Sequence, residues 1–214
     1  MGPDDIEARR RALQQSFAPR VERTRASINA AVRTLACDGQ ELSVAAIGRV
    51  AGISRATFYA HYSGLDGLAR AVWQDACVAV DDLFRFDLHT TPDAVPLVLG
   101  RLVEHVADHR SLYAAVAALP VSKASYLANV RAFADVIEQA LDDAPHDPPG
   151  LHAATTARYM ASAIYGLLDA WVAGELDLTE AELVEHLAVL HPFWNDATGR
   201  LPSTTCSDTR RLTP

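Results

Sequence analysis

Apolar residues recur at intervals of three and four along most of the chain, and polar residues fill the positions between them. In an α-helix this spacing places the apolar side chains on one face. The strict alternation of apolar and polar residues that indicates a half-buried strand does not occur over any length. Glycines 39 and 52 and the breaks at 89–93 and 142–150 separate the periodic stretches. The pattern therefore predicts an all-α protein.

The segment 43–68 reads as a short helix, a glycine turn, a second short helix and the start of a third. Apolar residues from Val44 to Val50 repeat every three positions, which predicts the first of these helices. Gly52 can adopt the left-handed conformation of a tight helix exit, and Ser54 can cap a new helix only two residues later. Two helices joined so closely cross steeply, as in the helix-turn-helix motif that places its second helix in a DNA major groove.

The outer side of the second helix carries residues suited to DNA. Arg55 can reach guanine O6 and N7, and Thr57 can meet a thymine methyl group or an acceptor. Ala56 is small enough for a close approach to the groove, and Tyr59 and His61 offer donors to phosphates. An ordinary helical hairpin with a solvated polar face is the other interpretation of the same residues.

A wider ordered set of small, aromatic and capping residues surrounds this motif over about 45 residues. Its members are Thr24-Arg25, Ile28, Ala30-Ala31, Gly39, Ser43-Val44, Ile47, Ala51-Gly52-Ile53-Ser54, Thr57-Phe58-Tyr59, His61-Tyr62 and Leu68. With these residues the segment resembles the DNA-binding domain of the TetR (tetracycline-repressor) family of transcriptional regulators. The resemblance implies that Thr24, Arg25, Ser43 and Ser54 contact DNA together with the second helix.

Two positions depart from the family pattern. The family usually has a lysine at the start of the helix after the motif, where it meets a phosphate, and this chain has Leu65. An acidic residue usually precedes the isoleucine of the first motif helix, and this chain has Ala46. The missing lysine leaves an alternative open, an all-α ligand-binding protein or enzyme that has lost DNA binding. The polar outer face from Arg55 to His61 favours the regulator.

The periodicity and the resemblance together predict a three-helix head followed by a helical body. The first core helix is expected from about Arg20 to Asp38, and a long stripe from Leu65 to Val80 is expected to link the head to the body. The expected divisions are a flexible basic arm at 1–19, a helix-turn-helix DNA-binding domain at 20–66, a helical effector-binding and dimerisation domain at 67–196, and a disordered tail at 197–214.

Charge is divided unevenly along the chain. The net charge is −8, but residues 1–65 hold nine arginines against six acidic residues, a net of +3, and the remainder carries −11. A basic head on an acidic body suits a DNA reader, although chance segregation of surface charge gives the same numbers.

Composition argues against a membrane or secreted protein. Half of the residues are hydrophobic, yet no run approaches the 18 or so apolar residues of a membrane span. The run Arg9–Arg11 has no apolar stretch behind it, so a secretory signal is not expected. Cys37, Cys77 and Cys206 are widely spaced and form neither a disulfide framework nor a zinc pattern. A cytoplasmic protein is expected.

Aromatic and histidine residues of the body are the candidates for ligand binding. Individually each is an ordinary core residue, but as a set they predict an apolar pocket with a few hydroxyl groups. They fall on helices that enclose a ligand cavity in the family: Trp73, His105, His109, Tyr113, Tyr126, Phe133, Tyr159 and Tyr165. His105 and His109 stand four apart, a metal-ligand spacing, but no acidic or cysteine partner accompanies them, so no metal is predicted. No nucleophile motif or phosphate loop is present, so neither a catalytic residue nor a cofactor is predicted.

Two apolar stripes near the C-terminal end, Tyr159–Val172 and Leu183–Trp194, predict a helical hairpin. Such a hairpin can pack inside one chain or pair with its copy in a four-helix bundle. The segment resembles the last two helices of TetR-like regulators, which implies the second arrangement. The expected interface residues are Ile164, Leu167, Leu168, Trp171, Leu183, Leu187, Leu190 and Trp194. The sequence thus predicts a homodimeric repressor that binds a palindromic operator and is released by a small apolar or aromatic molecule.

Overall fold

The computed structural model is all-helical over the residues that it describes, 3–87, 94–142 and 152–190, which confirms the predicted fold class. Side chains are described for 19–79, 96–141 and 152–190. The helices are α1 (Pro3–Cys37), α2 (Val44–Ala51), α3 (Arg55–His61), α4 (Leu65–Asp87), α5 (Ala94–Asp108), α6 (Arg110–Ala117), α7 (Lys123–Asp142), α8 (Ala153–Val172) and α9 (Glu180–Leu190). The predicted tail and Trp194 lie outside the described residues.

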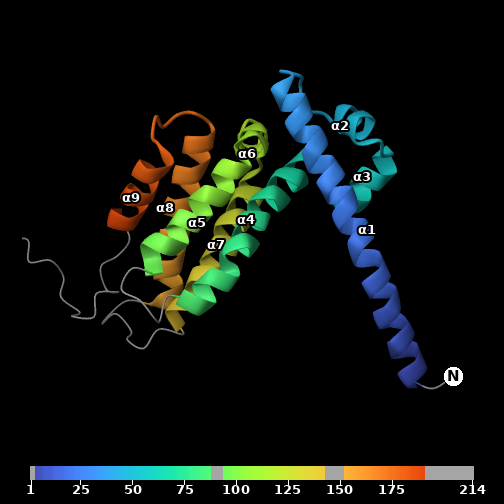
Figure 1. Cartoon of the computed structure of the whole chain (residues 1–214), viewed down its shortest axis with the longest axis horizontal. Coiled ribbons are helices and arrows are strands. Elements are labelled where there is room, and N and C mark those ends of the chain that lie inside the picture. Colours follow the sequence, from blue (N-terminus) through green and yellow to red (C-terminus); the bar gives the residue numbers. More distant parts are fainter. Residues whose placement is uncertain (1–2, 88–93, 143–151, 191–214) are drawn as a thin grey trace, which may run out of the picture.

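The first helix is longer than predicted. It begins at Pro3, so the expected start near Arg20 was wrong, and residues expected to form a flexible arm continue the helix. Pro19 lies inside α1 and marks the mistaken boundary. A proline removes one backbone hydrogen bond, but its fixed φ is already helical, so a helix can run through it at a cost. Figure 1 shows α1 extending well past α2 and α3.

The head consists of α1, α2 and α3 packed around one small core. Ile28, Val32 and Leu35 of α1 meet Ile47 of α2 and Phe58 of α3, and all five side chains have 0% exposure. Two apolar side chains of the head are not part of this core: Val21 is 39% exposed and Val50 is 42% exposed. A three-residue repeat drifts away from the 3.6-residue period of the helix, so Val50 has turned away from the face of Val44.

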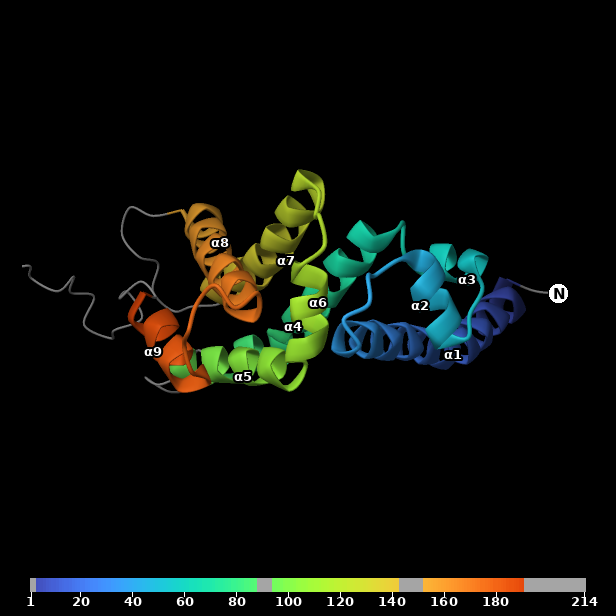
Figure 2. The ribbon, with the colours of Figure 1, turned by 90° about the horizontal axis from the view of Figure 1, so that it is seen from above.

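The body is built on α4, which leaves the head and contacts α5, α6 and α7. The helix α8 packs on α6 and α7, and α9 packs on α5. Figure 2 shows the head and α9 at opposite ends of the molecule, with α4 and α6 between them. The helix α1 also contacts α6, which gives the head a second support on the body. No helix within the described ranges is both long and apolar enough for a membrane span.

Candidate nucleic-acid interface and effector region

The helix-turn-helix is held by local caps of the kind that the sequence predicts. The Ser43 hydroxyl oxygen accepts from the Ala46 amide at 3.1 Å and caps α2. Gly52 ends that helix at φ 66°, in the left-handed region that glycine adopts most easily. The Ile53 amide donates to the Gly48 carbonyl at 2.9 Å, and a side chain at position 48 would stand 3.1 Å from the Ile53 carbonyl oxygen. Glycine at both positions therefore permits the tight turn.

The reading helix α3 presents a polar and small-residue surface. Phe58 is fully buried beneath it, whereas Arg55, Ala56 and Tyr59 are exposed and His61 is half-exposed. These four positions lie where the sequence predicts a DNA-facing surface, and their contact with DNA stays a prediction. Because α3 begins directly after the turn, its exposed N-terminal residues are the first to meet a groove.

Ser54 and Thr57 are engaged within the cap of α3. The Ser54 hydroxyl oxygen accepts from the Thr57 amide at 3.0 Å, and the two hydroxyl oxygens lie 2.8 Å apart. Either hydroxyl can donate in that second contact. Thr57 thus offers its methyl group more readily than its hydroxyl to a base, and Ser43 and Ser54 act first as caps.

Arg25 was expected on the DNA but is engaged elsewhere. Its Nη2 donates to Asp75 Oδ1 of α4 at 2.8 Å, and its Nη1 lies 3.7 Å from Glu22 Oε1. Burial raises the pKa of the Asp75 carboxyl above its ordinary value, although the Arg25 charge acts in the opposite direction. Burial likewise raises the pKa of the Tyr62 hydroxyl, against the hydrogen bond from Arg25. The Arg25–Asp75 ion pair joins α1 to α4, and the predicted contact of Arg25 with DNA stays a prediction.

The first turn of α4 is tied to the start of α7. The Asp66 carboxylate accepts from the Ser122 amide at 2.8 Å, the Ser122 hydroxyl at 3.0 Å and the Ser125 hydroxyl at 2.6 Å. The hydrogen bond from Ser125, followed by that from the Ser122 amide, lowers the pKa of Asp66 below its ordinary value. Leu65, which stands where the family usually has lysine, is half-buried and packs against the core. Ser122 also caps α7, since its hydroxyl oxygen accepts from the Ser125 amide at 3.1 Å, and its partner Asp66 lies 56 residues away in the sequence.

Five of the predicted ligand-binding residues form one aromatic cluster inside the body. The Trp73 ring centroid lies 4.8 Å from that of Tyr113 and 5.0 Å from that of Tyr165. Phe133 and Tyr126 lie 6.0 Å and 5.3 Å from Tyr165. Tyr126 is 41% exposed and covers the outer edge of Tyr165, whereas the other four are buried. Their rings meet at steep or tilted angles, the geometry that aromatic pairs prefer.

The two predicted histidines extend this cluster. The Tyr113 hydroxyl donates to the Val72 carbonyl at 3.3 Å, so the neighbouring His105 Nε2, at 3.1 Å, carries the proton that it donates to the Tyr113 oxygen. The His109 Nδ1 donates to the His105 carbonyl at 2.9 Å. Burial, and then the nearby His109, lowers the pKa of His105. Within the described part of the chain, no three His, Cys, Asp or Glu residues come together as a metal site.

A buried amide that the sequence analysis did not single out completes the cluster. The Asn129 side-chain amide donates to the Tyr165 hydroxyl at 3.2 Å, and its own oxygen is buried without a hydrogen-bond partner. Asn129 is only 1% exposed, and burial raises the pKa of Tyr165 to about 12. A buried carbonyl oxygen without a donor costs about 1–3 kcal/mol. Tyr159, predicted to join this set, is 67% exposed on α8 and lies outside the cluster, so its contact with a ligand stays a prediction.

The head carries the sequence signature of a known family. Residues 28–72, from the C-terminal third of α1 to the second turn of α4, match the model of the family described as bacterial regulatory proteins, tetR family. The head is therefore a DNA-binding domain of the TetR family. A comparison with curated protein sequences gave no match.

Solved structures share the fold of this protein over most of its length. A protein from Syntrophomonas wolfei assigned to the TetR family superposes with a TM-score of 0.63 at 12% identity, over 79% of this chain and 93% of that one. The fatty acid degradation regulator FadR from Bacillus halodurans gives a TM-score of 0.56 at 13% identity, over 77% and 95%. NalD of Pseudomonas aeruginosa, the secondary repressor of the MexAB-OprM multidrug efflux pump, gives 0.54 at 19% identity, over 78% and 93%.

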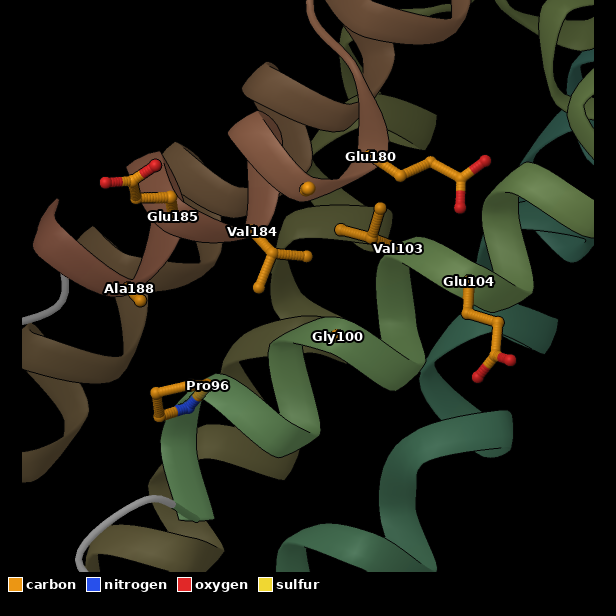
Figure 3. Close-up of a pocket in the computed structure, with 9 residues that line it drawn as sticks. Pro96, Gly100, Val103, Glu104, Glu180, Val184, Glu185 and Ala188 are labelled. Carbon is orange, nitrogen blue, oxygen red and sulfur yellow. The ribbon is translucent and has the colours of Figure 1, made fainter.

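An open groove of about 510 Å³ separates α5 and α9. Figure 3 shows Val103 and Val184 facing one another across it, with Glu104, Glu180 and Glu185 around them. No member of the aromatic cluster lines this groove. Its acidic rim and open shape distinguish it from the apolar pocket that the sequence predicts.

Most of the predicted dimer residues are buried inside a single chain. These side chains form the core between helices of the single chain, and their place in a dimer interface stays a prediction. The set is Ile164, Leu168, Trp171, Leu183 and Leu187, none more than 6% exposed. Periodicity identified the apolar stripe on α8 correctly. Within the single chain, α8 packs on α6 and α7. Leu167 is half-exposed, and Leu190 is 61% exposed.

Another face of α8 remains open. Tyr159 and Ala163 are exposed, and Gly166, Leu167 and Ala170 are half-exposed. These residues recur at intervals of three and four, so they form one stripe along the helix. The stripe combines an aromatic residue with small residues that permit a close approach of another helix.

Proposed function

We propose that this protein is a ligand-responsive TetR-family repressor that binds a palindromic operator as a homodimer and is released by a small apolar or aromatic molecule. The observation that carries the proposal is the surface of α3. Arg55, Ala56 and Tyr59 are exposed on a short, doubly capped helix whose other side is anchored by fully buried Phe58. A rigid helix with an exposed arginine near its N-terminus suits base reading in a major groove.

Homodimer formation is proposed through α8 and α9. The open stripe on α8, Tyr159 to Ala170, and the exposed Val189 and Leu190 on α9 supply apolar surface on helices expected to pair. A two-fold dimer presents two copies of α3, and a palindromic operator matches that symmetry.

The aromatic cluster supports an effector site in the body. Trp73, Tyr113, Phe133 and Tyr165 offer flat apolar faces, and Asn129 holds a buried oxygen that lacks a donor. A planar molecule with one N–H or O–H group would satisfy that oxygen while stacking on the rings. Tyr126, half-exposed at the edge of the cluster, is the side chain that such a molecule would displace first.

Release of DNA is proposed to pass through α4. The helix carries Trp73 in the cluster, is tied to α7 by Asp66 and is tied to α1 by Asp75. A molecule that separates α7 from α4 therefore moves a helix to which the head is attached. NalD, similar in fold, is described as a repressor, which agrees with the direction proposed here.

The competing function is an all-α ligand-binding protein or enzyme that has lost DNA binding. The experiment that separates the two is selection of duplexes from a random pool with the full-length protein. A repressor enriches a palindrome and binds it more tightly than a scrambled duplex in fluorescence anisotropy at low salt. Enrichment of no sequence, with equal binding of both duplexes, would leave the DNA-blind protein as the better account.

A further inference from the structure

A polar hollow lies beside the helix-turn-helix and has no part in the base-reading surface. It measures about 460 Å³ and opens between α1 and the turn that joins α2 to α3. Its lining residues are Arg20, Arg23, Thr24, Ser27 and Ile53. Both arginines are exposed, and no acidic side chain lines the hollow.

The two arginines share one face of α1 because positions 20, 23, 24 and 27 recur at helical spacing. Glu22 and Arg25 stand about half a turn away, and Arg25 pairs with Asp75 of α4. The helix therefore has one side that fastens the head to the body and one side that carries unneutralised positive charge.

The side chains in the hollow donate hydrogen bonds to backbone carbonyls of α1 and leave arginine nitrogens available to bind an anion. The Arg23 Nε donates to the Pro19 carbonyl at 3.2 Å, which orients the guanidinium and leaves both terminal nitrogens available. The Thr24 hydroxyl donates to the Arg20 carbonyl at 3.0 Å, and the Ser27 hydroxyl donates to the Arg23 carbonyl at 2.9 Å. With those hydroxyls committed, the arginines are the donors that remain. An arginine fork matches two phosphate oxygens at once.

The hollow adjoins the reading helix. Ile53, which forms one wall, immediately precedes the α3 cap Ser54 and the base-reading candidate Arg55. Anything bound in the hollow is therefore next to whatever occupies the groove in front of α3. A duplex in that groove places its sugar–phosphate backbone on either side of the helix.

We propose that Arg20 and Arg23 bind backbone phosphates of the operator duplex beside the groove entered by α3. They supply the phosphate contact that Leu65 cannot make, since Leu65 has no charge and packs against the core. The proposal rests on the proposed DNA-binding function and names residues outside the family match, which begins at residue 28. A duplex fits better than a small anion because the hollow is open and the acidic body would attract no anion by itself.

The test is a salt titration of DNA binding by the full-length protein. Fluorescence anisotropy gives the affinity for the selected operator and for a scrambled duplex, for wild type, Arg20→Ala, Arg23→Ala and the double variant. Arg131→Ala, which removes an exposed arginine from α7 in the body, is the matched control. Circular dichroism melts of each variant verify that the head remains folded.

Each alanine substitution is expected to weaken binding to both duplexes by the same factor, because a phosphate contact carries no base information. Each should reduce the slope of log K against log salt by up to about 1.8, since one phosphate contributes about 0.9 and a dimer holds two copies. Arg23→Lys should keep most of the slope because the charge remains. Arg131→Ala should match wild type.

Three different results would overturn the proposal, and each shows which part of it is wrong. If wild type selects an operator and the double variant keeps its affinity and slope, only the phosphate role of these arginines is wrong. If the variants lose preference for the operator rather than overall affinity, the two arginines read bases instead. If wild type selects no operator and binds no duplex, the proposed function fails, and this inference fails with it.

Discussion

The open face of α8 gives a direct test of where two copies meet. Gly166 lies in the middle of the exposed stripe, and nothing outside its own helix lies within 4 Å of the position that a Cβ would occupy. The Cβ atom of Gly166→Arg therefore meets no neighbouring helix in a single chain, and the stripe around it is partly exposed to solvent. In a dimer that pairs through this stripe, the same side chain would fall in the contact.

Gly166→Arg should change the stability of the single chain and the stability of the dimer in opposite directions and by different amounts. Arginine in a helix interior is better than glycine by about 0.8 kcal/mol, so the single chain should become slightly more stable. An unpaired arginine buried at an interface costs several kcal/mol, and two copies cost about 6 kcal/mol if each costs about 3. At about 1.4 kcal/mol per tenfold, the dissociation constant of the dimer rises by about ten-thousand-fold.

Sedimentation velocity over a range of concentrations measures the dissociation constant of the dimer, and a circular dichroism melt measures the thermal stability of the fold. We expect Gly166→Arg to sediment as a monomer with a melting temperature no lower than that of wild-type monomer. Gly100→Arg is the matched control, because Gly100 is also an open glycine inside a helix, and Glu104 one turn later can pair with the new charge. A wild-type dimer constant for Gly166→Arg would refute pairing through this face, and dissociation of Gly100→Arg instead would move the interface to the α5–α9 groove.

Three further predictions follow from single contacts. Asp66→Asn should lower the free energy of unfolding at pH 7 by about 1–2 kcal/mol for a solvent-accessible carboxylate with three donors. Because the folded pKa of Asp66 is depressed, its contribution is present above its unfolded pKa and lost as pH falls through the folded one. Denaturant titrations should show the difference shrinking below about pH 4; a constant difference contradicts the assignment. Asn129→Leu should change the melting temperature little, because removal of a buried carbonyl oxygen without a donor offsets the loss of the hydrogen bond to Tyr165; a clear fall would mean that the lost hydrogen bond outweighs the cost of that oxygen. Arg55→Ala should cost about 1–3 kcal/mol on the operator and relax preference at one base pair per half-site, and an equal loss on scrambled DNA would assign Arg55 to phosphates.

Features of the head that depend on neighbouring residues could be predicted from the sequence. The caps at Ser43 and Ser54 and the left-handed Gly52 each arise within four residues of chain, and the structure confirms all three. Phe58 belongs to the residues that carry the family resemblance and is fully buried. Short-range hydrogen bonds and steric preferences decide such features, so a sequence window contains the information that fixes them.

Features that depend on distant residues could not be predicted in the same way. From the sequence, Arg25 is predicted to be an exposed arginine. Its ion pair with Asp75 forms only in the folded chain, because the two residues are fifty positions apart. Leu168 was correctly predicted on an apolar stripe, but periodicity cannot say whether the same chain or a second copy covers that stripe. The open stripe through Gly166 was missed because its small residues carry little hydrophobic signal. Asn129 gave no signal either, since one polar residue on a helix is ordinary until its burial is known.

The contacts of α4 support the proposed control of DNA binding by the body. Asp66, Trp73 and Asp75 lie within ten residues of one helix, a span of about 14 Å. One is bonded to α7, one is packed in the aromatic cluster, and one is paired with α1. A helix interior is close to rigid over that length, so a shift that accommodates a molecule at Trp73 cannot leave both end contacts unchanged. Either the Asp66 bonds to α7 break or α1 moves with α4, and the second outcome turns the head relative to the body. Arg25, which pairs with Asp75, and Arg23, on the opposite side, belong to the same helix α1. A movement of α1 that follows Asp75 would therefore also move Arg23 and the adjoining reading helix.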